Sequence, residues 1–142
     1  MEKRTTELLR ELTGESRYDT FFIKNKKYFT SDSLPLCLEE IIERKNLRKG
    51  TVIREAQLNE IYGYQIFKGT RRPERSKLLC LLIAMKTGLE DAQRILKVCG
   101  YAQLYAKDLF DSIVIFSLSN GMTVAECSDL MLKHGLTELN KS

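Results

Sequence analysis

The stretch LRKGTVIREAQLNEIYGYQIFKGTRRP, residues 47–73 of 142, decides the fold of this chain. Its apolar residues recur every three or four positions, which is the spacing of one side of an α-helix. Two short helices are predicted, over residues 49–56 and 59–68. Only Gln57 and Leu58 separate them, and Asn59 is placed to cap the second helix. The stretch therefore predicts two short helices joined by a tight turn.

The two sides of this helix pair have different compositions. The side chains expected to face the core are Val52, Ile53, Ala56, Leu58, Tyr62 and Ile66. The side chains left for the outside of the second helix are Glu60, Ile61, Tyr64 and Gln65. A helix-turn-helix that binds DNA places the exposed side of its second helix in the major groove.

The rest of the chain shows the same helical periodicity, so an all-α protein is predicted. A first helix contains Leu8, Leu9 and Leu12 and ends near Gly14, and an irregular helical stretch follows with Phe21, Phe22, Tyr28 and Phe29. Ser33 is placed to cap a helix whose apolar side is Leu34, Leu38, Ile41 and Ile42. After Pro73, a helix with Leu78, Leu79, Leu82, Ile83 and Met85 is expected to be buried almost all round and to end at Gly88.

Three further helices are predicted over residues 89–99, 107–119 and 124–134, ending at Gly100, Gly121 and Gly135. Residues 89–100 and 124–135 share a pattern of apolar positions and a final glycine, so we interpret them as two similar amphipathic helices beside a central domain. The predicted organisation is an N-terminal helical extension (1–32), a helix-turn-helix domain (33–88) and a C-terminal helical extension packed on it (89–142).

The positive charge of the chain is concentrated in one place. Residues 68–77, called the basic segment below, contain five of the 23 basic residues and one of the 19 acidic residues, so the whole net charge of +4 lies there. Such a focus of charge is typical of a surface that binds phosphates. A solvated loop beside helix ends is the alternative interpretation.

Composition argues against several other classes of protein. The four cysteines are far apart and the single histidine is His134, so neither a zinc site nor a Cys/His catalytic pair is predicted. The cysteines are expected to be buried, reduced thiols. No phosphate-binding or dinucleotide-binding loop is present, so neither catalysis nor a cofactor is predicted. No signal segment or membrane-spanning run is found, which predicts a cytoplasmic protein.

Residues 47–73, with their ending Gly69-Thr70-Arg71-Arg72-Pro73, resemble the Cro/repressor (XRE-like) helix-turn-helix family, and the resemblance extends over residues 34–88. Beyond residue 88, the helix that starts at Leu89 and the link from Gly100 to Tyr105 look similar to those of a subgroup of small bacterial proteins of this kind. The resemblance implies a Cro/repressor-like bundle with flanking helices that regulates transcription by binding double-stranded DNA. Base contacts would come from Glu60, Ile61, Tyr64 and Gln65, and phosphate contacts from Lys49, Lys68, Thr70, Arg71 and Arg72.

Several residues depart from the family's pattern and favour an alternative function. Arg48 stands where a capping Ser or Thr is usual, and Gln57 replaces a turn glycine. Gly63 lies inside the second helix, at a cost of about 1 kcal/mol relative to alanine. Glu60 puts negative charge on the exposed side. The alternative is a protein-interaction module on a helix-turn-helix scaffold, with little or no DNA binding.

Two sets of residues, the aromatics of the second helix and the apolar run over residues 113–118, each allow two interpretations from the sequence. Tyr62, Gly63, Tyr64 and Phe67 could shape the helix for close approach to DNA or to another protein, or Tyr62 and Phe67 could be part of the core. The apolar run over residues 113–118 could face the protein's own core, which we favour, or a second copy of the chain in a homodimer.

Overall fold

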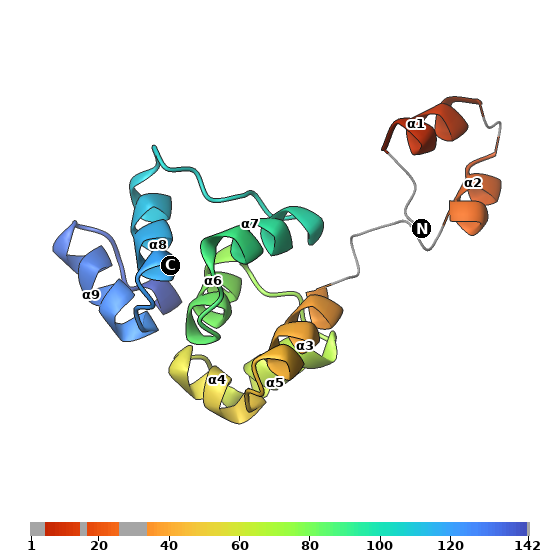
Figure 1. Ribbon diagram of the computed structural model, residues 1–142. Helices are drawn as coiled ribbons and strands as arrows, with labels where there is room; N and C mark the ends of the chain where they lie inside the picture. Colours follow the sequence, from red (N-terminus) through yellow and green to blue (C-terminus); the bar gives the residue numbers. More distant parts are fainter. Residues whose placement is uncertain (1–4, 15–16, 26–33, 142) are drawn as a thin grey trace.

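The computed structural model describes residues 5–14, 17–25 and 34–141 (Figure 1). All regular structure within these ranges is helical, which confirms the all-α prediction. In chain order the elements are α1 (Thr5–Gly14), α2 (Tyr18–Asn25), α3 (Leu34–Arg44), α4 (Lys49–Glu55), α5 (Glu60–Lys68), α6 (Arg75–Ala84), α7 (Leu89–Val98), α8 (Leu109–Ser119), α9 (Val124–Lys133) and the 3-10 turn η2 (Leu139–Lys141).

The first two helices contact each other. Helix α1 ends at Gly14 as predicted, and none of its residues is buried. Helix α2 has one buried side chain among those described, Phe21, which is 5% exposed. Tyr28, Phe29 and Ser33 lie outside the described residues, so the predictions made for them are not tested.

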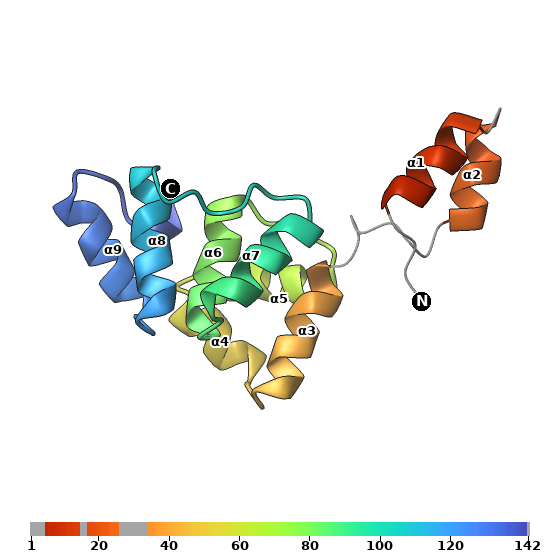
Figure 2. The ribbon, with the colours of Figure 1, turned by 45° about the horizontal axis from the view of Figure 1, so that its top comes forward.

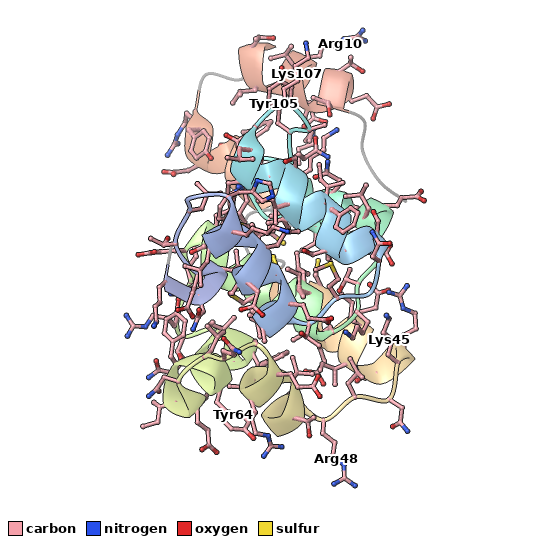
Figure 3. All side chains as sticks on the ribbon, turned by 90° about the vertical axis from the view of Figure 1, so that its left-hand side faces the viewer. Arg10, Lys45, Arg48, Tyr64, Tyr105 and Lys107 are labelled. Atoms are coloured by element: carbon pink, nitrogen blue, oxygen red, sulfur yellow. The ribbon has the colours of Figure 1, made fainter. Side chains whose placement is uncertain are left out.

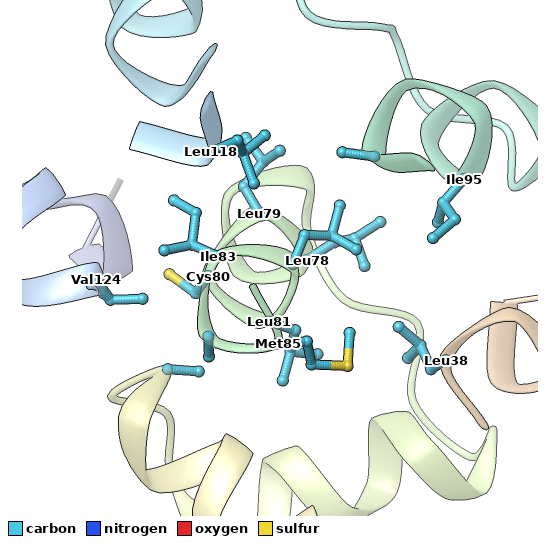
Figure 4. Packing of buried hydrophobic residues seen from close by; sticks show 14 of the residues in the cluster. Leu38, Leu78, Leu79, Cys80, Leu81, Ile83, Met85, Ile95, Leu118 and Val124 are labelled. Atoms are coloured by element: carbon cyan, nitrogen blue, oxygen red, sulfur yellow. The ribbon is translucent and has the colours of Figure 1, made fainter. Parts of the chain in front are cut away.

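Helix α6 is the centre of the core. Every side chain from residue 78 to residue 84 is buried, and so is Met85, which confirms that this helix is enclosed almost all round. Helices α4, α8 and α9 and the turn η2 all contact it. Figure 4 shows apolar side chains of neighbouring helices, among them Leu38, Ile95, Leu118 and Val124, surrounding those of α6. A helix without a polar side must be covered in this way.

The end of α6 differs from the prediction. The helix ends at Ala84 and not at Gly88, because Lys86 adopts a left-handed backbone with φ +56°. Gly88 instead precedes α7 as its N-cap. The backbone N–H groups of Lys86 and Thr87 close the helix end on the carbonyls of Ile83 and Leu82, each at 3.0 Å, which is the pattern of a helix that ends in a left-handed residue. The Lys86 Nζ also donates to the carbonyls of Gly121 and Met122 at 2.8 and 3.3 Å.

The helices on both sides of residue 88 share one core. Buried residues of α3 to α6 and of α7 to η2 form a single continuous cluster. Figure 2 shows the connection from α7 to α8 running across α6. Ile113, Val114 and Leu118 are buried in this cluster, which confirms that the apolar run faces the protein's own core, although Phe116 is 54% exposed.

None of the helices in the described ranges has the length and apolar character needed to cross a membrane.

Candidate functional site

The candidate site is built on α4 and α5, which pack on each other as predicted. Val52, Ile53, Ala56 and Ile66 are buried, with no more than 2% of each exposed. Asn59 caps α5, since its side-chain oxygen accepts a hydrogen bond from the backbone N–H of Tyr62 at 3.1 Å. These interactions fix the orientation of α5 on the domain.

Gly63 brings α4 and α5 together. A Cβ atom at this position would lie 2.5 Å from Cγ2 of Ile53, closer than side chains pack. The close approach expected of Gly63 is therefore made to Ile53 inside the chain and not to a partner molecule. Phe67 is buried and Tyr62 is half-buried against the core, which confirms the core interpretation for these two aromatics.

Two irregular positions predicted from the sequence are present around the turn. Arg48 precedes α4 and makes no side-chain capping hydrogen bond. Gln57 adopts a left-handed backbone with φ +59°, a conformation that glycine would adopt without strain. The carbonyl of Gln57 accepts a hydrogen bond from the Asn140 side chain at 3.4 Å, so the end of the chain contacts this turn.

The outer side of α5 is open to solvent. Ile61 is 71% exposed and Tyr64 is 43% exposed, and Glu60 is also exposed. Gln65 is half-buried, so it faces outward only in part. Figure 3 shows Tyr64 and Arg48 at the edge of the molecule formed by α4 and α5. Ile61 and Tyr64 are therefore two large side chains exposed to solvent on the same helix.

A groove of about 770 Å³ lies beside this outer side, between α4 and the start of α5. Its apolar lining includes Ile42, Leu47, Ile53 and Leu58, and its other lining residues are Arg48, Lys49, Gly50, Thr51, Arg54, Glu60 and Tyr64. Arg48 and Arg54 were not among the predicted site residues. Both side chains are exposed, and the signal for them in the sequence is their positive charge on or just before the predicted first helix of the pair.

The residues predicted to bind phosphate fall into two groups. Lys68, Thr70 and Arg71 are exposed at and just after the end of α5. The Arg71 guanidinium lies over the ring of Tyr62, 5.4 Å from its centroid. Lys49 instead has partners within the chain: its Nζ is 2.8 Å from a carboxylate oxygen of Glu39 and 5.7 Å from the centroid of the Phe67 ring.

Arg72 also has partners within the chain. Its Nη2 donates to the carbonyl of Cys99 at 2.7 Å, and its guanidinium lies 4.2 Å from the centroid of the Tyr101 ring. The Tyr101 hydroxyl donates to the carbonyl of Pro73 at 2.6 Å. Burial raises the pKa of Tyr101 above its ordinary value of 10.0, although the nearby Arg72 cation opposes this shift, so the hydroxyl remains a donor at neutral pH.

Arg75 and Lys77 complete the contacts between the basic segment and the C-terminal helices. Arg75 binds both carboxylate oxygens of Asp111, at 2.9 and 3.0 Å, and also donates to the carbonyls of Ala102 and Gln103. Lys77 Nζ donates to the carbonyl of Asn140. The basic segment predicted as a phosphate-binding patch therefore divides: Lys68 and Arg71 point outward, whereas Arg72, Arg75 and Lys77 bind the region from residue 99 onward.

The described residues form no group of three or more His, Cys, Asp and Glu side chains that could hold a metal ion. His134 is exposed at the end of α9. No protein-family model, curated protein or solved structure matches this chain.

Proposed function

We propose that this chain is a Cro/repressor-like, DNA-binding transcriptional regulator that docks on duplex DNA through the outer side of α5. The observation that supports the proposal is the exposure of Ile61 and Tyr64 on a capped helix, with outward-facing cations on both sides of it. An α-helix is about 10–12 Å wide with its side chains and fits a major groove about 12 Å wide. The nine residues of α5 span roughly 13 Å at 1.5 Å each.

The chemistry of this side suits base edges. Ile61 offers an apolar contact to a thymine methyl group, and Gln65 can pair with an adenine edge through its amide. Glu60 can accept a hydrogen bond from the amino group of a cytosine, which gives its negative charge a function in the groove. Tyr64, like Glu60, lines the groove beside α4.

Phosphate contacts are assigned to the exposed cations. Lys68 and Arg71, with Thr70, lie at one end of α5, and Arg48 and Arg54 line the groove on its other side. Lys49 and Arg72 contribute less to the affinity for DNA phosphates, because binding a phosphate would require them to leave the partners they already have.

The test is fluorescence anisotropy of a labelled random-sequence duplex, at low and near-physiological salt. We expect binding that weakens steeply as salt rises, because each phosphate contact releases about one counterion. On a target duplex selected from the random pool, Tyr64→Ala should weaken binding by about tenfold, which corresponds to about 1.4 kcal/mol of binding free energy. The matched control is Phe116→Ala, an aromatic of similar exposure on α8, which should leave affinity unchanged.

The groove supports a second candidate, a protein-interaction module. Its apolar lining lies beside Tyr64, and three cations of the basic segment have internal partners. If the duplex does not bind even at low salt, the DNA proposal is wrong. A partner protein captured by the wild-type chain but not by Tyr64→Ala would then support this second function.

A further inference from the structure

Two cysteines from distant parts of the chain face each other. The Sγ atoms of Cys37 on α3 and Cys99 at the end of α7 are 4.0 Å apart, although the residues are 62 positions apart in sequence. A disulfide requires a separation of about 2.05 Å, so closure needs a movement of about 2 Å in total. Rotation about the two Cα–Cβ bonds can supply most of that movement.

The surroundings of this pair favour reaction at Cys37. Cys37 is half-buried, so a small molecule in solvent can reach its sulfur, whereas Cys99 is buried directly behind it. An oxidant that reaches Cys37 therefore meets a sulfur whose neighbour, Cys99, lies within 4.0 Å.

The other two cysteines are not accessible to solvent. Cys80 and Cys127 are completely buried. Burial raises the pKa of Cys80 to about 12 and also raises the pKa of Cys127 above its ordinary value, so both remain thiols at neutral pH. They provide unreactive internal controls for the Cys37 and Cys99 pair.

We propose that Cys37 and Cys99 form a peroxide-sensitive thiol pair that is converted into a disulfide between α3 and α7. The Cys37 thiolate attacks one oxygen of a hydroperoxide and breaks the O–O bond, which gives a sulfenic acid and, after protonation, water or an alcohol. The Cys99 sulfur then attacks the Cys37 sulfur and displaces its hydroxyl as a second water. For hydrogen peroxide, two thiols and one peroxide give one disulfide and two waters.

This disulfide joins α3, the first helix of the predicted helix-turn-helix domain, to the C-cap residue of α7. A closed loop of 62 positions restricts the unfolded chain strongly. We expect the melting temperature of the oxidised protein to rise by about 5–10 °C. The inference does not depend on the proposed function, because it rests on the geometry of the sulfurs alone.

The experiment treats the full chain with hydrogen peroxide and then quantifies thiols after denaturation. The expected result is a decrease from four thiols to two, a mass loss of two hydrogens, and a tryptic species that links the peptides of Cys37 and Cys99. Dithiothreitol should restore the thiols and the original melting temperature. Cys37→Ser should slow thiol loss by about tenfold or more, because the accessible thiolate is gone. Cys80→Ala, the control, should still form the cross-link.

The peptide mapping uses wild-type protein, so it does not depend on whether a cysteine variant folds. The proposal is overturned if all four thiols survive, if oxidation ends as a sulfinic acid on Cys37, if Cys37 joins two chains, or if the cross-link forms between Cys80 and Cys127.

Discussion

The outer side of α5 and the basic segment were both predicted to contact a partner, but they differ in the structure: the first is exposed to solvent, and most of the second is bound within the chain. Ile61 and Tyr64 are exposed as their helical spacing predicts. Within the basic segment, Arg72, Arg75 and Lys77 bind other parts of the same chain. Helical periodicity therefore predicted the direction in which a side chain points, whereas charge composition did not predict what the charge binds.

The reason lies in the distance along the chain to each partner. The direction of a side chain on α5 depends on residues three or four positions away. Arg72, Arg75 and Lys77 find their acceptors 27, 36 and 63 positions further on, at Cys99, Asp111 and Asn140. Those pairings exist only after α7, α8 and η2 have packed on α6. The three cations thus hold the C-terminal helices against the domain that contains α5.

The largest effect is expected where α5 packs on α4. Gly63→Ala places a Cβ atom within 3.0 Å of three atoms of Ile53, so we expect the free energy of unfolding to fall by about 3 kcal/mol. Without this clash, alanine would stabilise the helix by about 1 kcal/mol, so the sign of the change is diagnostic. Chemical denaturation followed by circular dichroism measures it.

Gly88→Ala is the matched control for this change. A Cβ atom at Gly88 meets nothing within 4 Å, so the free energy of unfolding should change by less than about 1 kcal/mol. If Gly63→Ala stabilised the protein, the close packing of α5 on Ile53 would be wrong.

The next largest effect is expected in the ion pair between Arg75 and Asp111. The Asp111 side chain is 9% exposed, and it also accepts a hydrogen bond from the backbone N–H of Tyr105 at 2.9 Å. Asp111→Ala leaves the Arg75 guanidinium partly buried without its carboxylate, so the free energy of unfolding should fall by about 2 kcal/mol. Asp91→Ala removes the more exposed pair with Arg44 and should cost less than about 1 kcal/mol. Equal losses for the two variants would contradict an internal role for the basic segment.

Two neighbouring arginines give the smallest of these effects on stability. Arg72→Ala removes a charged hydrogen bond and a stacking contact, so we expect a loss of about 1.5 kcal/mol. Arg71→Ala removes only an exposed contact with the Tyr62 ring and should cost about 0.5 kcal/mol. Thermal melting of both variants measures the two losses of stability and shows which is larger. A larger loss for Arg71 would reverse the assignment of these two residues.

Sequence reasoning predicted local features well. It placed the ends of α1 and α5 and the cap at Asn59, because these depend on a few neighbouring residues. It also identified the strained Gln57, whose left-handed φ follows from its place in a tight turn. It predicted the inward-facing side of α4 for the same reason.

Sequence reasoning could not predict contacts between distant segments. It assigned the end of α6 to Gly88, because glycine is favoured at a left-handed helix end, whereas Lys86 adopts that conformation here. The ion pair of Lys49 with Glu39 and the close approach of Cys37 and Cys99 were missed because each joins residues of different helices or links. Such contacts depend on how whole helices pack.

The most direct test of the account compares two lysines of the basic segment, Lys68 and Lys77. Lys68 is exposed at the end of α5, whereas Lys77 binds the carbonyl of Asn140. The measurement is the slope of log affinity for duplex DNA against log salt, for Lys68→Ala and Lys77→Ala. We predict a slope reduced by about 1 for Lys68→Ala and unchanged for Lys77→Ala. Equal reductions would contradict the division of the basic segment, and an unchanged slope for Lys68→Ala would contradict DNA docking at α5.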